Sequence, residues 1–292
     1  MSESPHPLHR DEFPRSNAYD SDWVLDCQMG PNALWLVEWL TERMDLKPGM
    51  RVLDLGCGKA LTSVFLAREF GVQVWAADLW TPPDGNWERI RTAGVEDRVF
   101  PLQAEAHALP LAKEFFDAVV SVDAYEYFGT DELYLAYLTR FVRPRGTLGV
   151  VVPGLMQPIE GGVPEHLTQP QSNGASFWND ECICFLTADR WRALWQRSNR
   201  VDVAVVDTLP DGWKLWRDFE VAVESAGKSH FPSVAETLDN DAGRYLGFVR
   251  LVATRRDEAS AVNLYEPSLL ARFQGNEQEL VAGTQSRNRS AE

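Results

Sequence analysis

The sequence predicts an α/β fold, a doubly wound, mostly parallel sheet of seven strands with helices on both faces. Two observations carry this prediction. Short apolar runs alternate with helical patterns over residues 51–152, as expected for successive strand–helix units around a parallel sheet. The first of these runs, 51–55, also leads through Gly56 and Gly58 directly into a helical pattern. Such a turn lets a ligand lie against bare backbone and against unpaired helix N–H groups.

Taken in order, the chain gives seven strands with helices between them. A helix over 32–44 precedes the sheet, and the Lys47-Pro48-Gly49 segment separates it from the first strand. The predicted strands are 51–55, 72–77, 98–103, 116–122, 147–152, 201–207 and 245–254, and the predicted helices that connect them include 61–70, 86–93, 131–142, 188–198 and 213–223. Between the third and fourth strands we expect a turn rather than a helix.

Three other segments surround this sheet. Residues 154–180 are rich in Pro, Gly and Gln and interrupt the alternation, which predicts a functional insertion over about 154–187, after the fifth strand. Residues 1–30 are expected to form an N-terminal arm, either a tail packed on the surface or a set of lid helices. Residues 31–256 then form one ligand-binding α/β domain, and 257–292 a polar, partly disordered tail.

Composition argues against several classes of function. The net charge of -15 over 292 residues repels nucleic acid and anionic membranes, so the expected partner is a small molecule. No apolar run approaches the roughly 18 residues of a membrane span, and the first ten residues lack the apolar core of a secretory signal. We therefore expect a cytoplasmic protein, with a homodimer left open. The four cysteines fit neither a disulfide framework nor a metal site.

Acidic side chains stand at or near the carboxyl ends of four predicted strands. They are Asp54, Asp78, Glu105 and Asp123. In an open parallel sheet, ligands bind beyond the strand ends at the point where the strand order reverses. The four acids therefore predict a ligand site at this edge of the sheet.

The turn at Gly56 and Gly58 discriminates between two classes of cofactor. A dinucleotide site calls for a third glycine where this chain has Leu61, because that glycine allows close helix packing beside the pyrophosphate. Asp54 precedes the glycines and suits a ligand that carries an ammonium or a sulfonium better than one that carries phosphates. The turn therefore favours a cationic cofactor.

The segment Asp54-Leu55-Gly56-Cys57-Gly58 resembles the glycine motif of the class I S-adenosylmethionine-dependent methyltransferases, which have a Rossmann-like fold. The similarity covers roughly residues 32–153 and includes Asp78, the 104–106 and 116–121 segments and the Arg143-Pro144-x-Gly146 turn. The resemblance implies S-adenosyl-L-methionine as the cofactor and, by similarity to the bacterial small-molecule branch, a small-molecule substrate.

The resemblance also implies roles for single residues near the glycine turn. Gly56 and Gly58 would approach the methionine moiety, with Asp54 beside them. Asp78 would bind both ribose hydroxyls, since a carboxylate accepts two hydrogen bonds at once.

Further along the predicted sheet edge, Glu105 stands where the family more often has Asp. It would accept a hydrogen bond from the adenine amino group, beside the Ala106 amide. Leu79 and Trp80 would flank the adenine ring, and Asp123 belongs to the same expected cofactor site.

The segments expected to hold the substrate depart from the family pattern. Some bacterial members share the 13–17 and 29–32 segments and carry a histidine after the fourth strand, where this chain has Glu126. The stretch after Trp178, which includes Cys182, departs as well. The cofactor site is therefore ordinary for the family, and the reaction site is not.

Six side chains are candidates for the chemistry at that reaction site: Glu126, Tyr125, Tyr127, Tyr19, Trp178 and Cys182. Glu126 lies just beyond the fourth strand and is either a general base or a solvated loop acid. Tyr125 and Tyr127 either hold a cation by their ring faces or pack in the core. Tyr19 would close over the cofactor if the N-terminal arm is a lid.

Three functional hypotheses follow from these residues. The leading one is methyl transfer to an amine or another small-molecule nucleophile, with Glu126 or a tyrosine as the base. The second is cyclisation of the cofactor itself, which expels methylthioadenosine and gives azetidine-2-carboxylate. The third is an inert protein that binds S-adenosylmethionine without chemistry. The nucleoside by-product, S-adenosylhomocysteine or methylthioadenosine, separates the first two.

Overall fold

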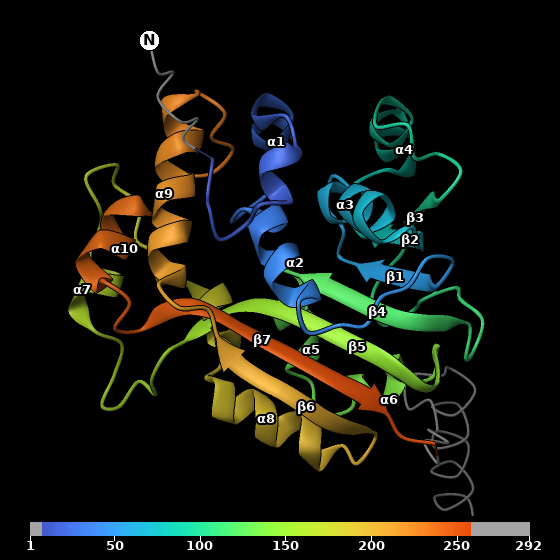
Figure 1. Cartoon of the computed structure of the whole chain (residues 1–292). Coiled ribbons are helices and arrows are strands. Elements are labelled where there is room, and N and C mark those ends of the chain that lie inside the picture. The colour runs from blue at the N-terminus through green and yellow to red at the C-terminus, as the bar shows by residue number, and fades with distance from the viewer. Residues whose placement is uncertain (1–7, 258–292) are drawn as a thin grey trace, which may run out of the picture.

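The computed structural model describes residues 8–257. Seven strands form one sheet in the order β3-β2-β1-β4-β5-β7-β6 (Figure 1). The strands are β1 (Arg51–Leu55), β2 (Gln73–Asp78), β3 (Val99–Gln103), β4 (Phe116–Val122), β5 (Val142–Leu155), β6 (Val201–Thr208) and β7 (Leu246–Arg255). Neighbours among β1 to β5 pair in parallel, and β7 is antiparallel to both β5 and β6. The predicted α/β class with a mostly parallel, seven-stranded sheet is confirmed.

The strand order reverses between β1 and β4. From β1 the chain steps outward through β2 to β3, then returns to β4 on the other side of β1. Backbone groups at the carboxyl ends of β1 and β4 diverge at such a switch point, which leaves a crevice there.

Helices cover both faces of the sheet (Figure 1). On one face α2 (Ala33–Thr41), α3 (Leu61–Phe70) and α9 (Gly212–Ser225) bury residues such as Phe65 and Phe219. On the other face α6 (Tyr134–Leu138) and α8 (Ala188–Arg197) pack Trp191 and Trp195 against the strands. The remaining helices are α1 (Ser21–Cys27), α4 (Pro83–Thr92), α5 (Glu126–Gly129), α7 (Glu165–Thr168) and α10 (Ala235–Asp241), with 3₁₀ turns η1 (Ser16–Ala18) and η2 (Asp180–Cys184).

The connection from β4 to β5 differs from the expectation. The helix predicted over 131–142 is reduced to the short α6, and β5 begins at Val142 rather than at residue 147. Val142 pairs with Phe116, and Arg143 Nε donates to Asp117 Oδ1 at 2.6 Å. These contacts draw the residues before Thr147 into the sheet, with an irregular register between Phe116 and Ala118.

The N-terminal arm is folded onto the domain over its described part. Asp20 caps α1 by accepting a hydrogen bond from the Trp23 amide at 2.8 Å. The Glu38 carboxylate in α2 accepts from the amides of Arg15 and Ser16 at 2.9 and 2.7 Å. These capping and anchoring contacts fix α1 above α2. Residues 1–7 of the arm, and the tail expected at 257–292 apart from Asp257, lie outside the described residues.

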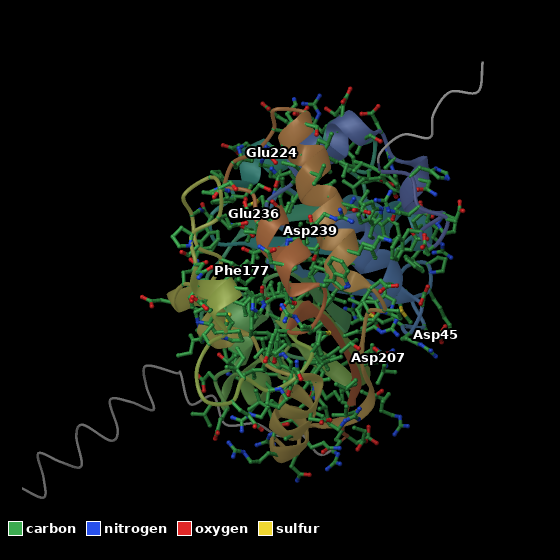
Figure 2. The ribbon with its side chains drawn as sticks, turned by 90° about the vertical axis from the view of Figure 1, so that its left-hand side faces the viewer. Asp45, Phe177, Asp207, Glu224, Glu236 and Asp239 are labelled. Atoms are coloured by element: carbon green, nitrogen blue, oxygen red, sulfur yellow. The ribbon has the colours of Figure 1, made fainter. Side chains whose placement is uncertain are left out.

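The insertion after β5 is anchored to α10. His166 Nε2 lies 2.9 Å from Asp241 Oδ1, and the Ser172 amide donates to Glu236 at 2.8 Å. Figure 2 shows Glu236 and Asp239 on the outer side of this region. The anchored insertion carries η2 to a position against α5. Over residues 8–257, the helices lack the combination of length and apolar character that crossing a bilayer requires.

Candidate functional site

A cavity of about 390 Å³ lies at the carboxyl ends of β1, β2 and β4. Its volume is within the range of roughly 300–1,000 Å³ that small-molecule sites occupy. The walls come from five segments, residues 27–31, 55–59, 77–80, 104–107 and 122–124, together with Ala33, Leu61, Thr62, Tyr127, Phe128 and Glu181. The cavity thus occupies the switch point, and the connection between α1 and α2 covers it.

The glycine turn adopts a backbone that favours its two glycines. Gly56 has φ +78° and Gly58 φ +51°, both in the left-handed region. A Cβ atom on Gly56 would lie 2.3 Å from the Ala124 side chain. The turn is held to β2, because the amides of Gly56 and Cys57 donate to the Ala77 carbonyl at 2.8 and 3.1 Å.

Asp78 joins the glycine turn to the far wall of the cavity. Its Oδ2 accepts from the Gly58 amide at 2.9 Å, and its Oδ1 accepts from the amides of Trp80 and Thr81 at 2.9 and 2.8 Å. A carboxylate offers about four acceptor positions, so Oδ2 retains one for a ligand. Leu79 and Trp80, which line the cavity, are 49% and 73% exposed, and their apolar surface is available to a ring.

Glu105 and Ala106 stand beyond β3 on the same wall. The Glu105 carboxylate accepts from the His107 amide at 2.9 Å, and its other oxygen lies 2.7 Å from His107 Nδ1. The Ala106 carbonyl accepts from the Tyr134 hydroxyl at 3.1 Å. The loop is therefore held in place by its own side chains and by α6.

Asp54 does not line the cavity. Its Oδ2 accepts from Thr62 Oγ1 and Ser63 Oγ, both at 2.6 Å, and its Oδ1 is buried with no hydrogen-bond partner among the described residues. Burial raises the pKa of Asp54 to about 6, although the hydrogen bonds from Ser63 and Thr62 lower it. Asp54 thus supports the first turn of α3 from inside the domain.

Asp123 stands at the opposite end of the cavity, after β4. Its backbone has φ +54°, and its amide donates to the Val151 carbonyl at 2.8 Å. The carboxylate lies against Gly30 of the cover, where a Cβ atom would be 2.3 Å from Asp123 Oδ2. Burial, and then the charge of Glu220, raise the pKa of Asp123 to about 8.

The three residues that follow β4 face different surroundings. Tyr127 lines the cavity and is 52% exposed. Glu126 does not line it: the side chain is fully buried, and neither carboxylate oxygen has a hydrogen-bond partner within residues 8–257. The alternative of a solvated loop acid at Glu126 is thus wrong, because the side chain is buried, and the role of a base stays a prediction. Tyr125 is also fully buried and packs against Phe128 and Trp191. This is the alternative in which Tyr125 packs in the core.

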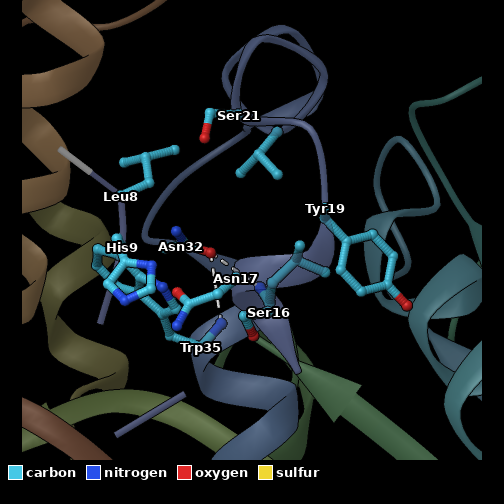
Figure 3. A pocket seen from close by; sticks show the side chains of 10 residues that line it. Leu8, His9, Ser16, Asn17, Tyr19, Ser21, Asn32 and Trp35 are labelled. Carbon is cyan, nitrogen blue, oxygen red and sulfur yellow. Dashed lines mark hydrogen bonds between the residues drawn. The ribbon is translucent and has the colours of Figure 1, made fainter. Parts of the chain in front are cut away.

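Tyr19, Trp178 and Cys182 do not line this cavity either. The Tyr19 hydroxyl donates to Glu69 Oε1 at 3.0 Å on α3, and Figure 3 shows the ring directed away from Asn32 beside a second, small cavity of about 50 Å³. Cys182 is buried, with Sγ 3.6 Å from the Phe177 carbonyl. The arm reaches the cavity through its last residues rather than through Tyr19, because Tyr19 packs on α3.

Several residues of the wall had no role in the sequence prediction. Gly30 and Glu181 are two of them, although Gly30 lies in the 29–32 segment that some family members share and Glu181 precedes Cys182. Lys59 is a third: its Nζ donates to the Asp26 carbonyl at 3.0 Å and lies 3.2 Å from His230 Nε2. Only contact across the fold distinguishes these residues from their neighbours in sequence.

Comparison with known proteins identifies the fold and its cofactor. A family model for the methyltransferase domain matches residues 53–150. The ubiquinone biosynthesis O-methyltransferase of Azorhizobium caulinodans is 31% identical over 194 residues, which are 63% of this chain and 73% of that protein. The chain belongs to the class I S-adenosylmethionine-dependent methyltransferases. The match to the methyltransferase GfsG of Streptomyces halstedii, 31% identical, covers 44% of this chain and 48% of that protein, so the chain spans about half of its length.

A solved geranyl diphosphate C-methyltransferase from Streptomyces coelicolor A3(2) shares the methyltransferase fold, with a TM-score of 0.58 and 18% identity over 75% of this chain and 78% of that one. The cofactor follows from the family rather than from this structure: S-adenosyl-L-methionine is the cofactor of the class to which the chain belongs. The residues fit it, because the bare glycine turn admits a close approach and Asp78 keeps an acceptor position.

Proposed function

We propose that this methyltransferase transfers the methyl group of S-adenosylmethionine to a small-molecule nucleophile bound in the same cavity. The observation that carries the proposal is the length of the cavity along the sheet edge. It extends from the loop after β3, past Asp78 at β2, to Asp123 at β4. Because β1 lies between β2 and β4, Asp78 and Asp123 are about two strand spacings apart, roughly 10 Å.

Under this proposal the two ends of the cavity have different tasks. Asp78 holds the ribose, the 105–106 loop receives the adenine, and the glycine turn supports the methionine moiety. S-adenosylmethionine supplies a methyl group on a sulfonium whose leaving group is neutral. The chain then has to align the acceptor and exclude water, and alignment alone accounts for a large part of such rate enhancements. The 27–31 connection covers the cavity and Tyr127 and Phe128 line its acceptor end.

Charge supports a small-molecule acceptor. The net charge of -15 repels both nucleic acid and anionic lipid. The names of the relatives span nitrogen, oxygen and carbon acceptors, so similarity does not choose the nucleophile.

The experiment that tests the proposal measures the nucleoside by-product. The protein is incubated with methyl-labelled S-adenosylmethionine and a panel of amine, hydroxyl, thiol and carbon acceptors. Labelled product with an equal amount of S-adenosylhomocysteine is expected, and Asp78→Ala should abolish both. Tight binding of the cofactor without transfer to any acceptor would refute the proposal and favour an inert binding protein.

The same measurement of the nucleoside by-product tests the cyclase alternative. Methylthioadenosine and azetidine-2-carboxylate from the cofactor alone would replace methyl transfer as the function. The two residues that motivated this alternative, Glu126 and Cys182, do not line the cavity. Methyl transfer is therefore the function that the geometry supports best.

A further inference from the structure

We infer that the acceptor is an amine that enters the cavity as its ammonium ion and gives its proton to Asp123. The inference rests on the proposed function, whose substrate class it names. It starts from the acidic wall that faces the acceptor end of the cavity and from the buried carboxylate behind that wall.

Asp123 is the acid that reaches the cavity. It lines the acceptor end, and its carboxylate is pressed against the bare backbone of Gly30. Glu181 of η2 lines the same cavity. Within residues 8–257, neither carboxylate forms an ion pair or receives a charged hydrogen bond from a basic side chain.

Two more carboxyl groups stand behind Asp123. Glu126, from α5, is fully buried with both oxygens unpartnered among the described residues, and its pKa is raised by burial and then by the charge of Asp123. The charge of Glu220, from α9, raises the pKa of Asp123, and burial raises the pKa of Glu220 itself. A buried carboxylate without a partner is costly, and a cation beside it removes that cost.

The basic side chains of the cavity are engaged elsewhere. Lys59 Nζ contacts the carbonyls of Asp26 and Gln28 at 3.0 and 3.5 Å, and the His107 ring lies 2.7 Å from Glu105. The other titratable groups near the acids are Tyr127, Glu181 and Cys184, which are neutral or negative. Lys59 therefore holds the cover rather than the acids, and a cationic ligand is the group that would pair with Asp123.

The cofactor alone does not supply enough positive charge. S-adenosylmethionine carries one sulfonium, one ammonium and one carboxylate, hence a net charge of one. Two carboxyl groups, those of Asp123 and Glu181, line this end, and Glu126 and Glu220 stand behind it with pKa values raised by burial. An ammonium acceptor adds a second cation, and the faces of Tyr127 and Phe128 on the same wall suit it by cation–π attraction.

The chemical step balances without another reactant. Asp123 in its carboxylate form takes one proton from the R–NH₃⁺ acceptor and becomes neutral. The nitrogen lone pair then forms the new N–CH₃ bond while the C–S bond breaks, and its electron pair stays on sulfur. The products are S-adenosylhomocysteine and the methylated ammonium, and Asp123 releases its proton to solvent when the products leave.

A raised pKa suits Asp123 to this transfer. The pKa of Asp123, about 8, is much closer to the pKa of an ammonium than the pKa of an ordinary aspartate is. Proton transfer is most efficient between groups of similar pKa. Because the carboxylate form is the active one, the rate should rise with pH through about 8. Glu220→Gln removes the charge that raises the pKa of Asp123, so it should lower this pKa and move the rise to lower pH.

The test uses the full chain and matched probes. Propylamine, hexylamine and phenethylamine are compared with the alcohols and carboxylates of the same chain lengths. Binding to the protein saturated with S-adenosylhomocysteine is measured by calorimetry, and transfer is measured with methyl-labelled cofactor. We expect at least one amine to bind ten-fold more tightly than its alcohol and carboxylate and to be N-methylated.

Variants separate the role of Asp123 from a structural one. Asp123→Asn should reduce amine binding ten-fold or more and the rate by a hundred-fold, with cofactor binding retained. Glu220→Gln should shift the pH profile, whereas Glu88→Gln, an exposed acid of α4 outside the cavity, should shift nothing. Thermal unfolding of each variant identifies any that fails to fold, and the pH shifts remain a second readout.

Several results would overturn the inference. Alcohols or carboxylates that bind as well as the amines would do so, as would an unchanged pH profile in Glu220→Gln. Methyl transfer to hydroxyl, thiol or carbon acceptors only would refute the amine and leave the proposed function standing. Ammonium-selective binding without transfer of any methyl group would instead leave the ammonium site standing and refute the proposed function.

Discussion

Gly30→Ala is expected to disable the acceptor end of the cavity without disturbing the cofactor end. The glycine lies in the cover, and a Cβ atom there would stand 2.3 Å from Asp123 Oδ2 and 3.4 Å from its Cγ. The backbone of Gly30 is outside the left-handed region, unlike that of Gly56 and Gly58. Alanine is therefore compatible with the backbone, and the cost of the substitution falls on the Asp123 side chain.

The size of the effect follows from that overlap. Ordinary contact begins near 3.4 Å, so the carboxylate oxygen of Asp123 must retreat by about 1 Å. A displacement of about 1 Å at a reacting group costs on the order of 100-fold in rate, which is about 2.7 kcal/mol of activation free energy. We expect kcat for the best amine acceptor to fall by about this factor, with the Kd for S-adenosylmethionine within roughly three-fold of its original value.

The assay is the initial rate of S-adenosylhomocysteine formation, with cofactor binding measured by calorimetry. Gly85→Ala is the matched control, because Gly85 lies in α4 outside the cavity and its Cβ would meet only the flexible end of Arg89 at 3.3 Å. A Gly30→Ala enzyme with an unchanged rate would refute the position given to Asp123. An equal loss of cofactor affinity would instead mean that the substitution disturbs the whole cavity.

Three further predictions concern the cofactor end. Asp78→Ala should weaken S-adenosylmethionine binding roughly 100-fold by calorimetry, since charged hydrogen bonds are worth about 1.5–3 kcal/mol each; a change under three-fold would contradict its role. Thr62→Val should destabilise the fold by about 1–3 kcal/mol in urea at pH 8. Because the lost bond serves ionised Asp54, whose pKa is about 6, that loss should fade below pH 6; a pH-independent loss would speak against it. Lys59→Met removes the hydrogen bond from Lys59 to the Asp26 carbonyl, so the cofactor should dissociate several-fold faster in stopped-flow. An unchanged rate would exclude Lys59 as a tie to the cover.

The cofactor end was predictable because its geometry is local. A strand, a glycine turn and a helix follow one another over residues 51–70, and β1 and α3 begin and end as the sequence predicts. Asp78 ends the next strand, so parallel pairing with β1 brings it to the same sheet edge. Asp54 shows the limit of this reasoning: it precedes the glycines, yet its side chain points into the domain and accepts from Thr62.

The reaction end was not predictable from local pattern. Asp123 and Glu126 are three residues apart, but one lines the cavity and the other is fully buried. The left-handed backbone at Asp123 and the start of α5 turn these side chains in different directions, and Tyr125 goes to the opposite face of the sheet. Periodicity rules assume one regular element, and no regular element spans these residues.

By itself the sequence determined the α/β sheet, the position of the ligand edge and the cofactor class, because strand periodicity, turn glycines and strand-end acids are properties of short contiguous segments. The tertiary structure alone decided which groups face the acceptor. Gly30 from the arm and Glu220 from α9 approach Asp123 only after the chain folds, and Glu181 from the insertion then lines the same cavity. Burial then separates acids that look alike in sequence, because the pKa of a carboxyl group depends on the solvent and charges around it.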